Sequence, residues 1–256
     1  EGNNLRLGWD LNNEEWPESF KKLEWFNSLP KIVRSGQILS KISPCKAKEF
    51  GLPRDLLIVS GTTDSNAAVL AANPKNSEGV TILGSTIVLK SFVDKPINSM
   101  GISNHRIGKR WLLGGASNAG GAILKKFFSD QEIEEISNQI NPRIDSGIKL
   151  VPLLFRGERF PYDDPYMMPV LNPRPISDCI YLQALLEGLT KIELDGWKKL
   201  QSLGVPSIKK IITIGGGSKN LNWQKLRQRK IGIPIIRCKN PPAMGAAILA
   251  LKALIN

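Results

Sequence analysis

Apolar and polar residues alternate along this chain in blocks that predict strands and helices in turn. Short apolar runs bounded by glycine or proline predict strands, and longer stretches with apolar residues at helical spacing predict helices. The expected strands lie at 56–60, 80–84, 86–92, 111–115, 208–214 and 234–237, and the expected helices at 15–28, 65–72, 119–128, 130–140, 177–203 and 241–255. Since strands alternate with helices, the pattern indicates an α/β fold.

Two stretches lack either pattern. Residues 73–79 consist almost entirely of turn-forming residues, which predicts a linker and a domain boundary. Residues 152–175 are rich in proline and glycine without a clear period, so we expect a long ordered loop there.

The net charge of the chain limits the kinds of ligand that it is expected to bind. Its 256 residues include 35 Lys and Arg against 23 Asp and Glu, a net charge of +12, but the basic residues are spread along the sequence. One of the densest runs, from Lys225 to Lys230, alternates with other residues as a solvated helix face does. Without an RNA-binding or zinc-finger signature, nucleic-acid binding is disfavoured, and the positive potential equally suits a polyphosphate ligand.

Other classes of protein are excluded by what the sequence lacks. No apolar stretch is long enough for a membrane span and no secretory signal is visible, so a cytoplasmic location is expected. Three widely separated cysteines and the lone His105 disfavour a disulfide framework, a zinc site and histidine-based catalysis.

The segment 61–66, Gly-Thr-Thr-Asp-Ser-Asn, lies at the junction between an expected strand and an expected helix. An acidic residue at such a junction can accept a proton from a substrate hydroxyl, which is one interpretation of Asp64. A carboxylate there can equally cap the helix by accepting hydrogen bonds from its free N–H groups. The spacing alone supports these two interpretations of Asp64 equally.

Three glycine-rich segments follow or contain expected strand ends, at 83–86, 114–121 and 214–220. Glycine lets a backbone approach phosphate closely, but tight turns and close helix packing also require it. None matches the P-loop or the dinucleotide-binding fingerprint. A further segment, 157–161, pairs Glu158 with Arg159, which predicts an internal ion pair that holds the long loop.

Short segments along nearly the whole chain follow one another in a recognisable order. They are SGQIL at 35–39, GLP at 51–53, GTTDSNAA at 61–68, LGST at 83–86, GGASNAGGA at 114–122, GERFP at 157–161, LLEGL at 185–189, GGGSKNLNWQ at 215–224 and AMGAAILA at 243–250. In this order they resemble the FGGY carbohydrate kinases, and most of all the plant and cyanobacterial branch that is similar to xylulose or ribulose kinases.

The resemblance implies an actin-like, ribonuclease H-like ATPase fold of two α/β domains. Residues 1–75 are then the end of a sugar-binding domain whose larger part is missing, and residues 76–256 an ATP-binding domain. The implied activity is ATP-dependent phosphorylation of a sugar hydroxyl with Mg²⁺, on a ketopentose such as D-ribulose or D-xylulose. The sugar is the expected partner, and a homodimer is left open.

The same resemblance assigns roles to individual residues. Asp64 matches the catalytic base, and Thr63 and Asp64 match sugar-binding positions. The matched ATP-binding residues are Gly84, Ser85, Thr86, Gly120, Gly121, Gly215, Gly216, Gly217, Ser218 and Asn220. No residue of this chain is assigned to a metal.

One departure from the family pattern is large. The family opens with an Asp-x-Gly-Thr phosphate-binding hairpin, and this sequence contains no Asp-x-Gly-Thr. We therefore expect the chain to be a fragment that is inactive alone. The alternative is a non-catalytic module of the same fold that binds nucleotide or sugar for regulation.

Overall fold

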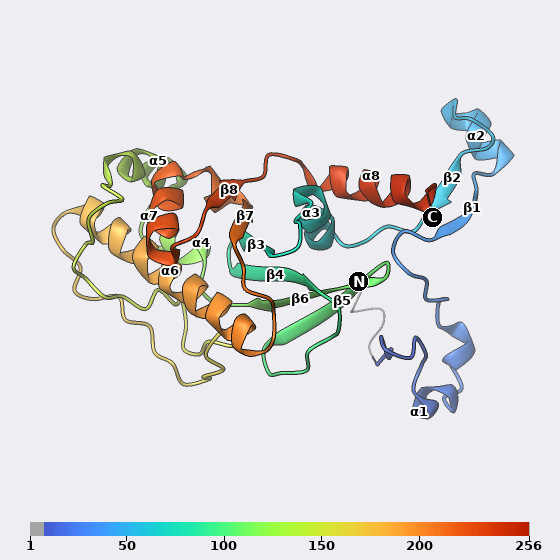
Figure 1. Ribbon diagram of the computed structural model, residues 1–256, viewed down its shortest axis with the longest axis horizontal. Coiled ribbons are helices and arrows are strands. Elements are labelled where there is room, and N and C mark those ends of the chain that lie inside the picture. The colour runs from blue at the N-terminus through green and yellow to red at the C-terminus, as the bar shows by residue number, and fades with distance from the viewer. Residues whose placement is uncertain (1–7, 256) are drawn as a thin grey trace. The chain divides into compact units, whose positions relative to one another are not determined.

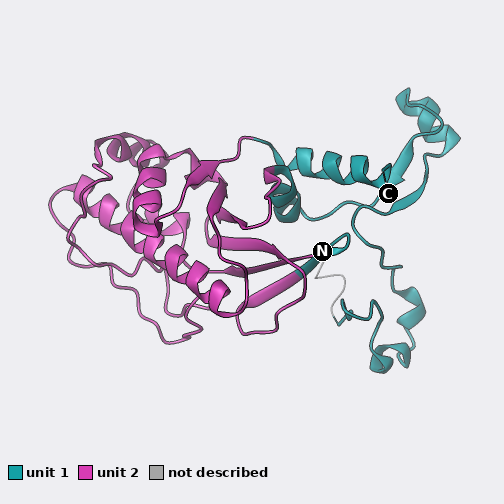
Figure 2. Ribbon diagram, in the orientation of Figure 1, with its two compact units in different colours: residues 1–71, 105–110, 240–256 teal, residues 72–104, 111–239 magenta. Residues whose placement is uncertain are grey.

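The computed structural model describes residues 8–255 and divides the chain into two compact units (Figure 2). Unit 1 contains residues up to 71 together with 105–110 and 240–256, and unit 2 contains residues 72–104 and 111–239. The C-terminal helix therefore groups with unit 1. The boundary expected between residues 75 and 76 separates two domains of the family, which are defined differently from these units, and it stays a prediction.

A six-stranded sheet with the order β5-β6-β4-β3-β7-β8 forms the centre of unit 2, although residues 105–107 of β5 and Arg110 of β6 group with unit 1 (Figure 1). Strand β4 is antiparallel to both β3 and β6, whereas β7 is parallel to both β3 and β8. The strands are β3 (Glu78–Leu83), β4 (Ile87–Val93), β5 (Ile102–Ile107), β6 (Arg110–Ala116), β7 (Lys210–Ile214) and β8 (Ile235–Arg237). The expected strands of this sheet are confirmed, and β5 was not anticipated.

The long helix α6 (Asp178–Ser202) packs against α5 (Asp130–Gln139), α7 (Leu221–Ile231) and β4 (Figure 1). Its helical spacing places Leu182, Leu185 and Leu189 on one fully buried stripe. The Ser177 hydroxyl caps the helix by accepting the Ile180 N–H. Within the described residues, no helix is both long enough and apolar enough to span a membrane.

A buried ion pair joins α6 and α7 to the sheet. Arg227 of α7 donates through Nε and Nη2 to the two carboxylate oxygens of Glu193 in α6, each at 2.6 Å. Glu193 also accepts from the Thr81 hydroxyl at 2.6 Å, and Arg227 donates to the Thr213 hydroxyl at 3.0 Å. Both charged side chains are only 1% exposed. The interpretation of residues 225–230 as a solvated helix face is therefore wrong for Arg227.

In unit 1, strands β1 (Ile38–Lys41) and β2 (Leu57–Val59) form an antiparallel pair, and helix α8 (Pro242–Ala253) packs against β2. A Cβ atom on Gly245 would lie 1.9 Å from the carbonyl oxygen of Ala67, so α8 crosses helix α3 (Asp64–Ala72) at backbone contact. The helix α2 (Pro44–Phe50) lies between the two strands in sequence. Neither β1 nor α2 was expected.

The helix expected at 15–28 is wrong. The structure has only the short helix α1 (Glu18–Lys21) and a 3₁₀ turn at Phe26–Ser28. The aromatic residues whose spacing suggested one helix pack on one another instead: the ring of Trp16 stacks on that of Phe20 with centroids 5.8 Å apart. Such ring contacts offer burial that does not require a continuous helix.

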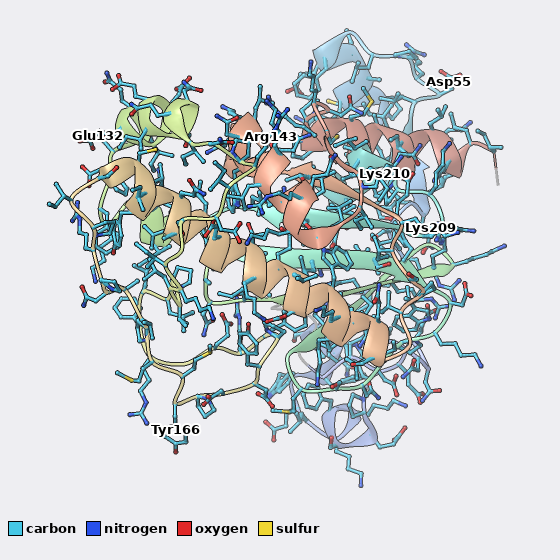
Figure 3. The ribbon with its side chains drawn as sticks, turned by 60° about the vertical axis from the view of Figure 1, so that its left-hand side comes forward. Asp55, Glu132, Arg143, Tyr166, Lys209 and Lys210 are labelled. Atoms are coloured by element: carbon cyan, nitrogen blue, oxygen red, sulfur yellow. The ribbon has the colours of Figure 1, made fainter. Side chains whose placement is uncertain are left out.

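The helix expected at 119–128 is reduced to α4 (Gly121–Leu124). Gly120, with φ 167° and ψ −157°, lies outside the helical region and sets the start of α4, and the Gly121 N–H donates to the Gly84 carbonyl oxygen at 2.8 Å. The long loop expected at 152–175 is confirmed, with only isolated bridges such as that between Glu158 and Asp164. The exposed Tyr166 projects from it, with Arg156 stacked 4.5 Å from the ring centroid (Figure 3).

Candidate functional site

The sheet topology brings the three glycine-rich segments to one edge. Because β3 and β7 are parallel, their carboxyl ends meet at the same edge, and the antiparallel β4 begins there. Strand β6 is antiparallel to β4, so it ends at this edge too. The turn 84–86, the segment 117–121 and the loop 215–220 therefore leave the sheet together, and we call these three segments the glycine edge.

The turn 84–86 is in direct contact with Gly120 and Gly121. The N–H groups of Gly121 and Ala122 donate to the carbonyl oxygens of Gly84 and Ser85, at 2.8 and 3.2 Å. A Cβ atom on Gly120 would lie 2.4 Å from Cα of Thr86. Close packing of two backbones thus requires glycine at 120, while Gly84 and Ser85 remain exposed.

The loop 215–220 combines packed glycines with an open one. Gly215 has a φ of +91°, and a Cβ atom there would lie 2.5 Å from the carbonyl oxygen of Leu83. Gly217 packs in the same way against Trp223, because an added Cβ atom would approach the ring to 2.7 Å. Gly216, in contrast, is exposed and has nothing within 4 Å of its Cβ position. Its bare backbone is open to a ligand.

Ser218 and Asn220 use their side chains within the protein. The Ser218 hydroxyl donates to the carbonyl oxygen of Gly215 at 2.6 Å and is largely buried. The Asn220 side chain caps α7 by accepting the Trp223 N–H at 2.9 Å, and its amide donates to the Ser137 hydroxyl at 2.7 Å. Because both side chains form hydrogen bonds within the protein, they stabilise the shape of the loop. A ligand would instead contact the exposed backbone at Gly216.

The ion pair expected between Glu158 and Arg159 is wrong. The Glu158 carboxylate accepts hydrogen bonds from Ser117 and Asn118, and Arg159 donates through Nε to the carbonyl oxygen of Ala116 at 2.6 Å. Both residues therefore bind the segment that leads to Gly120. Sequence reasoning missed this role, although the charged GERFP motif was its visible signal.

Asp64 belongs to unit 1, where it is the first residue of α3, shortly after β2 ends. Its side chain is exposed, and Oδ1 accepts the N–H of the adjacent Ser65 at 2.7 Å. Thr63 precedes the helix, and its carbonyl oxygen accepts the Ala67 N–H at 2.8 Å. An exposed carboxylate at a helix N-terminus is available to a substrate hydroxyl.

The residues of the glycine edge suit phosphate better than a metal ion held by protein alone. Exposed backbone at glycine offers N–H donors without steric obstruction. Among residues 8–255, no group of three or more His, Cys, Asp or Glu side chains could hold a metal ion. Mg²⁺ that arrives with a nucleotide needs no such cage, because phosphate oxygens and water supply most of its ligands.

Residues 57–254 match the model of the C-terminal domain of the FGGY family of carbohydrate kinases. A xylulose kinase from Bacillus subtilis is 24% identical to this chain over 237 residues, which cover 86% of this chain and 47% of the relative.

Solved structures share the fold at low sequence identity. A structure described as a xyloylose kinase from Brucella ovis superposes with a TM-score of 0.81 at 21% identity, over 95% of this chain and 53% of the other. Glycerol kinase from Plasmodium falciparum, solved with ADP, gives 0.75 at 18% identity, over 96% and 52%. The expected actin-like ATPase fold is thereby confirmed, and the chain spans about half the length of these proteins. Since the family model matches most of the sequence, the chain belongs to the FGGY family of carbohydrate kinases.

Proposed function

We propose that this chain supplies the ATP site and the catalytic base of a kinase that phosphorylates a sugar hydroxyl. The observation that carries the proposal is the meeting of three glycine-rich segments at one sheet edge, with exposed backbone at Gly84, Ser85, Gly215 and Gly216. A turn between strands and a strand-to-helix junction, both rich in glycine, together form a suitable cradle for a nucleotide.

Within this edge, we assign the nucleotide contacts to the residues that the family resemblance named. The turn of Gly84, Ser85 and Thr86 supports the phosphates, and Gly120 and Gly121 border the nucleotide. The loop from Gly215 to Asn220 lies on the adenosine side. ADP in the structure of the Plasmodium falciparum glycerol kinase supports a nucleotide in this fold.

Asp64 is the proposed base. Its carboxylate accepts the proton of the sugar hydroxyl as that oxygen forms a bond to the γ-phosphorus and the bond from the γ-phosphorus to the β,γ-bridging oxygen breaks. The products are a sugar phosphate and ADP. Mg²⁺ that accompanies ATP neutralises phosphate charge in this reaction, and positioning with electrostatic stabilisation accounts for most of the catalysis.

We further propose a ketopentose substrate, D-xylulose or D-ribulose. Similarity to a xylulose kinase from Bacillus subtilis supports this substrate class. Because no Asp-x-Gly-Thr occurs in this sequence, we expect the chain alone to be catalytically inactive and the complete enzyme to need a second set of phosphate contacts. A cytoplasmic location and a homodimer remain predictions.

Two neighbouring glycines test the adenosine-side loop of the proposed nucleotide site. Gly216→Ala meets open space, so we expect its free energy of unfolding to stay within about 0.5 kcal/mol of the wild type. If the adenosine side of the nucleotide passes over this backbone, the Kd for ATP should rise about tenfold, equivalent to about 1.4 kcal/mol. Isothermal titration of a complete protein that carries this sequence, with ATP and Mg²⁺, measures this Kd.

Gly215→Ala is the matched structural variant. Its positive φ and the 2.5 Å approach to Leu83 predict a loss of about 1–3 kcal/mol in stability. Unchanged ATP affinity in Gly216→Ala would argue against a nucleotide at this loop, whatever Gly215→Ala does.

The second candidate is a non-catalytic module that binds nucleotide or sugar, and the absence of Asp-x-Gly-Thr favours it. The two functions separate in a complete protein that carries this sequence. Release of ADP that depends on an added pentulose establishes the kinase, whereas ATP binding without sugar-dependent ADP release establishes the module.

A further inference from the structure

Glu158 carries a buried carboxylate that accepts three hydrogen bonds from other residues of the chain. The residue is 1% exposed. Its Oε2 accepts the Ser117 hydroxyl at 2.6 Å, and its Oε1 accepts the backbone N–H groups of Asn118 at 2.7 Å and Phe160 at 3.2 Å. A buried carboxylate is costly without such donors, so this arrangement is strongly specified.

The residues around Glu158 reinforce the same contact. Arg159 donates to the carbonyl oxygen of Ala116, and the Asn118 side-chain amide donates to that of Gly157 at 3.0 Å. The Phe160 ring lies so close to the backbone of Gly115 that a Cβ atom there would approach it to 2.4 Å. The loop 157–161 therefore holds the end of β6 by side-chain and backbone bonds together.

From Ser117, hydrogen bonds continue toward the glycine edge. The Ser117 hydroxyl that donates to Glu158 also accepts the Ala119 N–H at 2.9 Å. Ile87 then binds both residues: its carbonyl oxygen accepts the Ser117 N–H at 2.9 Å, and its N–H donates to the Ala119 carbonyl oxygen at 2.7 Å. Gly120 and Gly121 follow directly and contact the turn 84–86.

We propose that Glu158 is a positioning residue for nucleotide binding: through Ser117 and Asn118 it sets the backbone of residues 117–121 against the turn 84–86. This inference rests on the proposed ATP site. Glu158 acts through the segment that it binds and does not itself contact the nucleotide.

The chemistry of the contact explains why a carboxylate is needed. Both carboxylate oxygens act only as acceptors, and together they receive one O–H and two N–H donors. A glutamine of the same size has one acceptor oxygen, and its NH₂ group would face a hydroxyl or backbone N–H groups. Glu158→Gln should therefore disturb the segment although it leaves no cavity, and Glu158→Ala should disturb it more.

The test combines ATP titration with amide hydrogen exchange on a complete protein that carries this sequence. For Glu158→Gln we expect faster exchange at the amides of residues 117–122 and a rise of about tenfold in the Kd for ATP, as charge-assisted hydrogen bonds are lost. Ser117→Ala, which removes one donor, should produce a smaller change of the same kind. The two changes should not add, because both variants break the same bond.

Leu182→Ala is the control for a general loss of stability. Leu182 is fully buried in α6, so this variant should unfold at lower temperature without selective exchange at residues 117–122 or a change in the Kd for ATP. A complete protein that binds ATP while its Glu158→Gln variant binds it equally well would overturn the positioning role. Failure of the proposed function looks different, because the complete wild-type protein would then not bind ATP.

Discussion

Asp64→Asn is expected to lower sugar-dependent ADP release by about a hundredfold to ten-thousandfold, the usual contribution of a general base. The amide retains the size of the side chain but cannot accept the hydroxyl proton at neutral pH. Because Asp64 is assigned to the sugar hydroxyl and not to the nucleotide contacts, the Kd for ATP should not change. Both quantities are measured in a complete protein that carries this sequence, with ATP, Mg²⁺ and D-xylulose or D-ribulose.

Asp55→Asn provides the matched control. Asp55 is another exposed carboxylate of unit 1 (Figure 3), and the same loss of charge there should leave the turnover number unchanged. Near-wild-type turnover in Asp64→Asn would remove Asp64 from the role of base. Equal losses in the two variants would point to the charge of unit 1 rather than to proton transfer.

Arg227→Ala is expected to lower the free energy of unfolding by about 3–5 kcal/mol, because it leaves a buried carboxylate without its charged partner. Glu193 and Arg227 are both 1% exposed, and their bonds reach β3 and β7 through Thr81 and Thr213. Urea unfolding followed by tryptophan fluorescence measures the loss.

Two further variants test the cause of that loss. Lys191→Ala breaks an ion pair with Asp195 on the same helix, but the Lys191 side chain is 68% exposed, so its removal should cost under about 1 kcal/mol. The double replacement Glu193→Leu with Arg227→Met removes both charges and should cost less than Arg227→Ala alone. Losses of equal size in Arg227→Ala and Lys191→Ala would contradict this account of the buried pair.

The long helix and the buried strands could be predicted from the sequence because their patterns are local. The helical spacing of Leu182, Leu185 and Leu189 defined the buried stripe of α6, and the apolar runs defined β3, β4 and β7. Local pattern failed at 15–28, where aromatic rings pack on one another, and at β1, whose four residues are all exposed. An exposed strand has no buried face to generate an alternating pattern.

The candidate site, too, could be predicted from the sequence only in part. Its members could be named from short motifs, because glycine turns and the segment around Asp64 are continuous in sequence. The role of Glu158 could not be predicted from short motifs. Its partners Ser117 and Asn118 are far from it along the chain, and only the folded loop brings them within hydrogen-bond distance. For the same reason, Arg227 looked like part of a solvated face until its partners on α6 and the sheet were known.

The sequence by itself thus determined the α/β class, the family and the residues of the glycine-rich segments, since each depends on neighbours along the chain. Only the tertiary structure decided that these segments share one edge, that Gly120 and Gly215 are needed for backbone packing, and that Gly216 is open. The physical reason is strand pairing: the parallel register of β3 with β7 and the antiparallel register of β4 with β6 join distant segments, and no local pattern specifies those partners.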